Sequence, residues 1–155
     1  MIDFGMTAAV FRERYFERAP YLFAQALKER PFNWSDLDAL LQQNEPTPQG
    51  LQLFHRGLIA DEAYTEDCSA FGLRRWRLNK VRFYGHLTAG ATLVLNRLEL
   101  QSVAAQKLCT EIGRFAAQPA TGNAYVSFRG DGTFGKHWDT HDVFAVQLIG
   151  RKRWR

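Results

Sequence analysis

Apolar side chains along the chain follow two different spacings, which together predict a mixed fold of helices and strands. In three segments they recur every three or four positions, the spacing of one buried helical face. These segments are residues 7–17, 33–41 and 101–117. Short apolar or alternating runs, which are typical of strands, occupy residues 21–23, 51–54, 58–60, 89–98, 123–127 and 142–149.

Polar residues and prolines mark the expected ends of the helices. Thr7 can cap the first helix, and Ser35 with Asp38 fits the S-x-x-[DE] capping pattern of the second. Pro20 and Pro119 are expected to end the first and third helices, because proline has no amide hydrogen to donate. Residues 61–67 are acidic and are expected to be exposed.

A basic segment, residues 71–82, combines five cationic side chains with Trp76. Cations and an aromatic ring are what a nucleic-acid-binding surface uses, for the phosphates and for base stacking. The same pattern fits an ordinary solvated face with Trp76 and Leu78 turned inward, and we favour this second interpretation.

The composition places the chain among folded, domain-sized proteins. Its 155 residues are 46% hydrophobic, 14% aromatic and 23% charged, with a formal net charge of +4. Cys68 and Cys109 are too few for a disulfide framework, so we expect a reduced, cytoplasmic setting. The start of the chain lacks signal-peptide character, and the longest stretch without formal charge, residues 83–96, is too short and polar to span a bilayer.

The candidate chemistry lies in an H-x-D triplet near the end of the chain. In an extended strand, residues two apart point to the same face, so His137 and Asp139 can direct an imidazole and a carboxylate to one point. These are two of the three ligands of a 2-His-1-carboxylate Fe(II) site. A hydrogen-bonded surface pair is the alternative. His141 shares their parity and is expected to line the pocket, because three ligands on one strand converge poorly.

The residues around this triplet resemble a known family. The pattern runs from H-x-D through V-F and Q to a turn glycine and a basic strand, and it resembles the JmjC-type cupin oxygenases, most closely their ribosomal-oxygenase branch. The matching residues are His137, Asp139, Val143, Phe144, Gln147, Gly150, Lys152, Trp154 and Arg155. Weaker similarities lie in residues 15–27, in 89–98 and in the N-x-Y of Asn123 and Tyr125.

The resemblance implies a mixed, mainly β fold, a double-stranded β-helix (cupin or jelly roll) with N-terminal and inserted helices. It implies one JmjC/cupin-like domain over residues 1–155, in which residues 1–50 form an opening helical segment and residues 51–155 begin the β-helix. The implied activity is that of an oxidoreductase, a dioxygenase that uses Fe(II) and 2-oxoglutarate to hydroxylate a protein side chain, with a ribosomal protein as the implied substrate class. His137 and Asp139 would bind the metal, and Lys152, Tyr125 and Asn123 would bind 2-oxoglutarate. No membrane and no direct nucleic-acid contact are expected, and a homodimer is left open.

One departure from the family pattern bears on activity. The family's second metal histidine lies several strands after the turn, so we expect it beyond Arg155 and expect the barrel to be incomplete at the C-terminus. The 155 residues alone should then be inactive. Two alternatives are kept, a non-catalytic cupin-like binding module and a basic nucleic-acid-binding domain.

Overall fold

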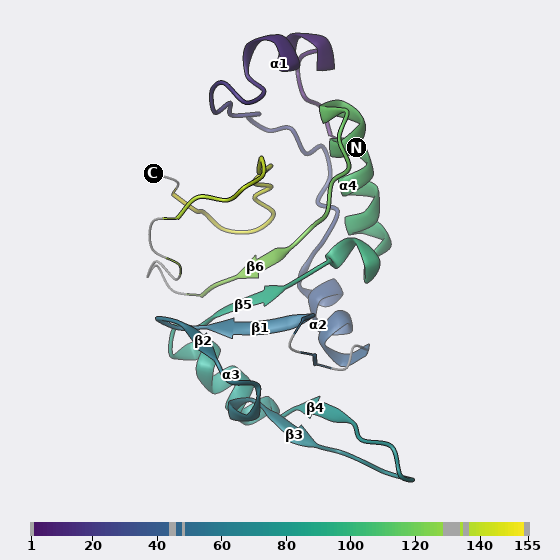
Figure 1. Ribbon diagram of the computed structural model, residues 1–155, viewed down its shortest axis with the longest axis vertical. Coiled ribbons are helices and arrows are strands. Elements are labelled where there is room, and N and C mark those ends of the chain that lie inside the picture. Colours follow the sequence, from purple (N-terminus) through teal and green to yellow (C-terminus); the bar gives the residue numbers. More distant parts are fainter. Residues whose placement is uncertain (1, 44–45, 48, 129–133, 135–136, 154–155) are drawn as a thin grey trace. The chain divides into compact units, whose positions relative to one another are not determined.

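The chain divides into two compact units, each built from segments that are far apart in sequence. The structure is a computed structural model and describes residues 2–43, 46–47, 49–128, 134 and 137–153 (Figure 1). The first unit consists of Met1–Leu37, Glu99–Gly122 and Asp139–Arg155, and the second of Asp38–Leu98 and Asn123–Trp138. One helix, α2 (Trp34–Gln43), contains the first boundary between them.

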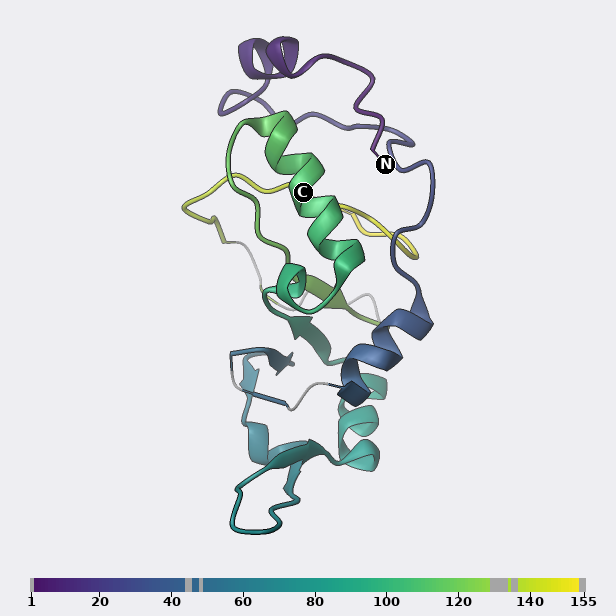
Figure 2. The same cartoon turned by 90° about the vertical axis from the view of Figure 1, so that its right-hand side faces the viewer.

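The second unit is organised around a four-stranded antiparallel sheet (Figures 1 and 2). Its strands are β1 (Leu51–Phe54), β2 (Leu58–Ile59), β5 (Thr92–Leu95) and β6 (Ala124–Val126), in the order β2-β1-β5-β6. Strand β5 pairs with β1 on one side and with β6 on the other, and all four of its residues are buried. A central strand of this kind is covered on both faces, which explains its continuous apolar sequence.

One face of the sheet carries the core of the second unit. Leu53 and Leu93 are cross-strand partners and are both fully buried. Tyr64 and Phe83 are also buried, and their rings lie 6.3 Å apart. Phe83 comes from α3 (Lys80–Thr88), and the Tyr64 hydroxyl donates a 2.6 Å hydrogen bond to Asp61. Burial and the neighbouring Asp61 carboxylate raise the pKa of Tyr64, so the phenol stays protonated.

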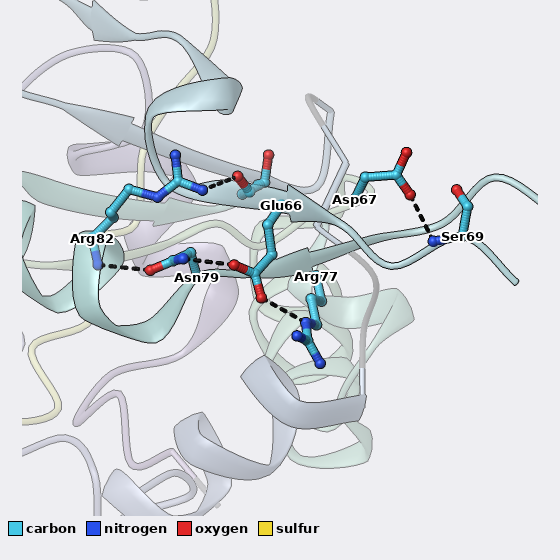
Figure 3. A network of polar contacts seen from close by, with 7 residues as sticks. Glu66, Asp67, Ser69, Arg77, Asn79 and Arg82 are labelled. Carbon is cyan, nitrogen blue, oxygen red and sulfur yellow. Dashed lines mark hydrogen bonds and ion pairs between the residues drawn. The ribbon is translucent and has the colours of Figure 1, made fainter.

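A hairpin of β3 (Thr65–Asp67) and β4 (Trp76–Leu78) precedes α3 and is held at its base by polar contacts (Figure 3). Glu66 accepts hydrogen bonds from Arg77 Nε (2.8 Å) and Asn79 Nδ2 (2.6 Å). Asn79 also caps α3 by accepting from the amide of Arg82, whose guanidinium donates to the Thr65 carbonyl at 2.6 Å. The two strands and the helix start are therefore tied into one network.

The hairpin turns through Phe71 and Gly72, both with positive φ, of 53° and 77°. Ala70 and Leu73 exchange both backbone hydrogen bonds across them, at 3.2 and 3.0 Å. This is the geometry of a two-residue type I′ turn, which favours Asn-Gly. A bulky residue in the left-handed region costs roughly 1–2 kcal/mol, so Phe71 is an unfavourable residue for the turn that it occupies.

The first unit is held together by aromatic rings along α1 (Ala8–Arg14) and α4 (Val103–Ala116). Phe115 is 8% exposed and stacks on Phe4, with ring centroids 3.7 Å apart. Its ring also lies 5.0 Å from Phe11 and 5.8 Å from Phe23. Phe144, from the C-terminal segment, reaches the same cluster at 5.8 Å from Phe11.

Several predicted elements are confirmed, with changes at their ends. Thr7 caps α1, which ends at Arg14 rather than Glu17, and α4 lies within the predicted helix 101–117, with Ser102 as a cap that was not predicted. The capping of α2 was assigned to the wrong residues. Asn33 accepts from the amides of Ser35 and Asp36, and Asp36 accepts from the amide of Asn33. This is a capping box two residues earlier than Ser35 and Asp38.

Other predictions were wrong. Residues 21–23 form no strand, because the neighbouring backbone pairs only through the bridge of Ile2 with Leu27. In the segment 61–67, Tyr64 and Thr65 are buried rather than exposed. Trp76 was expected to turn inward and is 39% exposed. Helix α3 was missed, although Asn79 is a typical N-cap residue.

The predicted mainly β double-stranded β-helix is found only in part. Mixed helices and small antiparallel sheets are present, but over the described residues the four α-helices contain more residues than the six strands. No closed jelly roll forms among these residues. The described residues of 142–149 form no strand either, since none of them has a ladder partner within the described part of the chain. The glycine-rich segment 130–135 lies outside the described residues, Phe134 excepted, as do Trp154 and Arg155.

We predict that Phe115→Ala destabilises the protein by about 3–5 kcal/mol, because it empties the centre of the aromatic cluster. Val103→Ala on the same helix removes a side chain that is 69% exposed and should change the free energy of unfolding by no more than about 0.5 kcal/mol. Chemical denaturation of both variants measures the difference. Equal stabilities would show that the cluster contributes little.

We also predict that the hairpin loosens in acid. Hydrogen bonds from Asn79 and Arg77 lower the pKa of Glu66. Because this pKa is lower in the folded state than in the unfolded state, the ionised Glu66 carboxylate stabilises the fold above its unfolded pKa. This stabilisation is lost as the pH falls through the folded pKa. NMR signals of the β3 and β4 amides should therefore disperse at neutral pH and collapse in acid. In Glu66→Gln, they should depend less on pH. An unchanged pH profile would exclude Glu66 as the acid-sensitive group.

Candidate functional site

The face of the sheet opposite the leucine core is polar and aromatic. Strand alternation places Gln52, Val94 and Tyr125 in one row across β1, β5 and β6, and Phe54 beside Thr92 in the next. Thr92 and Val94 are buried, whereas Tyr125 is about half exposed. This face therefore offers a buried floor with a phenol at its β6 edge.

Phe134 joins this face to the predicted metal histidine. Its ring centroid lies 4.9 Å from that of Phe54 and 5.9 Å from that of Tyr125. The imidazole of His137 lies 6.1 Å from the same ring in an edge-on arrangement. The structure thus brings together two of the predicted site residues, Tyr125 and His137, through a phenylalanine that the sequence analysis did not single out. An aromatic residue within a glycine-rich segment was the available signal.

The second predicted metal ligand, Asp139, follows His137 after one residue. Chain geometry keeps their Cα atoms within about 7 Å of each other. Both side chains are exposed, and residues 137–139 form no strand, so the predicted alternation is not what directs them. The boundary between the two compact units falls between Trp138 and Asp139. His141 is exposed as well.

The donor types suit Fe(II), but the set is incomplete. An imidazole nitrogen and a carboxylate oxygen are ligands that non-haem Fe(II) accepts. Among the described residues, no group of three or more His, Cys, Asp or Glu side chains gathers closely enough to hold a metal ion. Among these residues, no third donor therefore gathers with His137 and Asp139.

The predicted 2-oxoglutarate residues belong to different compact units, Asn123 and Tyr125 to the second and Lys152 to the first. Tyr125 is on β6, beside Phe134, and Asn123 lies just before that strand. Asn123 Oδ1 accepts a 3.1 Å hydrogen bond from the amide of Arg97, a residue with φ of 53°. This hydrogen bond joins the two ends of the long connection that contains α4. The oxygen of the Asn123 side chain is used in this contact, so its predicted hydrogen bond to the cofactor would come from the side-chain nitrogen. Lys152 belongs to the first unit and is exposed.

A separate shallow pocket lies along α4 in the first unit, lined among others by Glu99, Cys109 and Gly113. Burial, reinforced by the charge of Glu99, raises the pKa of the Cys109 thiol. A thiol held protonated in this way is a poor nucleophile and a poor metal ligand. This pocket therefore has none of the chemistry of the histidine site.

Comparison with known proteins gives one match. Residues 94–155 match the family model of the JmjC domain, a stretch that begins in β5 and contains α4, β6, His137, Asp139 and Lys152. No curated protein and no solved structure matches the chain. No helix in the described part of the chain is long and apolar enough to cross a membrane.

The family match confirms the resemblance that the H-x-D segment predicted, while the ribosomal-oxygenase branch stays a prediction. It covers the whole pattern from the β5 strand to the turn lysine, including the two proposed metal ligands. Residues 94–155 are therefore similar to a JmjC domain.

Proposed function

We propose that the protein is an Fe(II)- and 2-oxoglutarate-dependent oxygenase that hydroxylates a protein side chain. The observation that carries this proposal is the JmjC match over a segment that contains both members of the H-x-D pair and Lys152. When bound, Fe(II) and 2-oxoglutarate supply the oxidising power, since O2 converts 2-oxoglutarate to succinate and CO2 and a substrate C–H to C–OH.

His137 and Asp139 would hold the metal. Both side chains are exposed, so an ion can reach them, and the edge-on contact with Phe134 restricts the rotation of the imidazole. Restricting a ligand before the metal arrives reduces the entropy that binding costs. Phe134, whose ring also contacts Phe54 and Tyr125, would lie beside the metal-bound imidazole.

Lys152 would hold the distal carboxylate of 2-oxoglutarate. An ammonium group forms a charge-assisted hydrogen bond with a carboxylate, which is stronger than a neutral one. Its position two residues after Gly150, which has a φ of 77°, supports this role, because the turn sets the direction of the segment that follows. Tyr125 and Asn123 would add weaker hydrogen bonds from the sheet.

A second candidate is a non-catalytic cupin-like binding module. Such a module would need no third donor beside His137 and Asp139, and among the described residues none gathers with them. Iron-dependent decarboxylation of 2-oxoglutarate by the full-length protein supports the oxygenase, and binding of 2-oxoglutarate without turnover supports the module. The substrate, for which a ribosomal protein side chain is the proposed class, is tested by mass spectrometry for the gain of one oxygen atom.

We predict that His137→Ala and Asp139→Ala each weaken Fe(II) binding by at least about a hundredfold. Loss of an outer-shell partner alone costs tenfold to a hundredfold, and these residues would touch the metal directly. Anaerobic Fe(II) titration measures the effect in the full-length protein, with exposed His55→Ala as the matched control. Unchanged affinity in both variants contradicts the assignment, and an equal loss in His141→Ala would make His141 a ligand.

We predict that Lys152→Ala weakens 2-oxoglutarate binding about tenfold to a hundredfold and leaves Fe(II) binding intact. Removing a hydrogen bond to a charged group costs about 1.5–3 kcal/mol. Arg153→Ala, which removes the neighbouring cation, is the matched control. If the two variants bind 2-oxoglutarate equally well, Lys152 does not hold its carboxylate.

A further inference from the structure

The tip of the β3–β4 hairpin, residues 68–76, has features that neither the core nor the proposed oxygenase site uses. Phe71 is fully exposed at the end of the turn, and Leu73 is 60% exposed beside it. The turn adopts the type I′ conformation, for which Phe71 is a poor residue. A strained backbone that holds an apolar ring out in water contributes nothing to folding, which points to a role in binding.

The hairpin holds this tip in a defined place. Between the Glu66 network and the turn, the backbone amide of Cys68 donates to the carbonyl of Arg75 at 2.9 Å, and the amide of Arg75 donates to Ser69 Oγ at 3.1 Å. Ser69 in turn donates to Asp67 at 2.6 Å, as Figure 3 shows. These contacts continue the ladder to the turn, so the tip is ordered before any partner arrives. A preordered surface loses less entropy on binding.

The tip is also cationic. Residues 68–76 contain Arg74 and Arg75 and no acidic residue. The acidic residues at the base, Glu66 and Asp67, accept hydrogen bonds from Arg77, Asn79 and Ser69. Arg74 and Arg75 directly precede β4 and both are exposed, next to Trp76, which is 39% exposed.

We infer that the hairpin tip binds single-stranded nucleic acid. Phe71 and Trp76 offer ring faces on which bases stack, and Arg74 and Arg75 offer charge to the phosphates on either side. Unpaired bases expose the faces that stacking needs, whereas a duplex hides them. The sequence alone favoured a solvated face with Trp76 turned inward. The exposure of Phe71 and Trp76 and the conformation of the turn favour a nucleic-acid-binding surface over a solvated face.

The deciding experiment separates stacking from folding. In Phe71→Asn the ring is removed, and the new residue suits the left-handed conformation, so the hairpin should be at least as stable as before. Anisotropy of a labelled oligouridine should show a loss of affinity of about tenfold, within the range for one stacked base. Thermal unfolding of the variant verifies that the fold is retained.

The charge contribution is tested with the double variant Arg74→Gln/Arg75→Gln. For single strands, each phosphate contact contributes about 0.7 to the slope of log K against log salt, so the slope should fall by about 1.4. Arg12→Gln/Arg14→Gln removes the same charge from exposed positions on α1 and should leave the slope near that of the unaltered protein.

Two competitors of the oligouridine and a binding assay with phosphatidylserine vesicles complete the test. If oligodeoxythymidine competes as well as unlabelled oligouridine, the tip binds single-stranded DNA and RNA alike, through base stacking and phosphate contacts. If oligouridine competes better, the ligand is RNA. Duplex RNA should compete poorly. The inference is overturned if Phe71→Asn binds oligouridine as tightly as the unaltered protein, if the unaltered protein does not bind it, or if duplex RNA competes equally. It is also overturned if phosphatidylserine vesicles bind through Phe71 while oligouridine does not.

Discussion

The pairing of β5 on both of its edges is the constraint on which the second unit depends. Strand β1 aligns Leu53 with Leu93, and β6 aligns Leu93 with Val126, so one register runs across three strands. A shift by one residue would turn every leucine of this row to the opposite face. The same register presents Thr92, Val94 and Tyr125 on the other face. The leucine core and the floor of the candidate site are therefore two consequences of one alignment.

Irregular parts of the chain are held by side chains that satisfy backbone amides. Asn33 caps α2, Asn79 caps α3, and Asn123 satisfies the amide of Arg97. Glu99 in the same way accepts from the amide of Gly122 at 2.9 Å. The first amides of a helix have no partner within the helix, and a side-chain cap satisfies one of them. In each case a polar side chain fixes where an element starts or a connection closes.

The proposed chemistry and the proposed nucleic-acid surface make different demands on the fold. Metal ligation asks for a few donors that converge, and the described residues supply His137 and Asp139, with Phe134 beside the imidazole. The hairpin tip instead offers exposed rings and charge on a rigid support. An oxygenase that modifies a protein within a nucleic-acid-rich assembly would benefit from both, because a second contact raises the effective concentration of the substrate.

The sequence by itself determined the elements whose signals are local. The stripes of α2 and α4, the cap Thr7, and strand β5 follow from spacing and side-chain chemistry within a few residues. The H-x-D pair and the JmjC similarity were also readable, because a motif is a linear property. Asn79 before α3 was a local signal of the same kind, which the cationic residues around it obscured.

Only the tertiary structure decided the features that join distant residues. The run Tyr21–Phe23 is apolar enough for a strand, yet Phe23 packs instead against Phe4 and Phe115. No spacing rule links residues that are about ninety positions apart. The contact of Phe134 with His137 and the exposure of Phe71 likewise depend on where the sheet and the hairpin lie. Local sequence sets which conformations are low in free energy, and burial against distant partners selects among them.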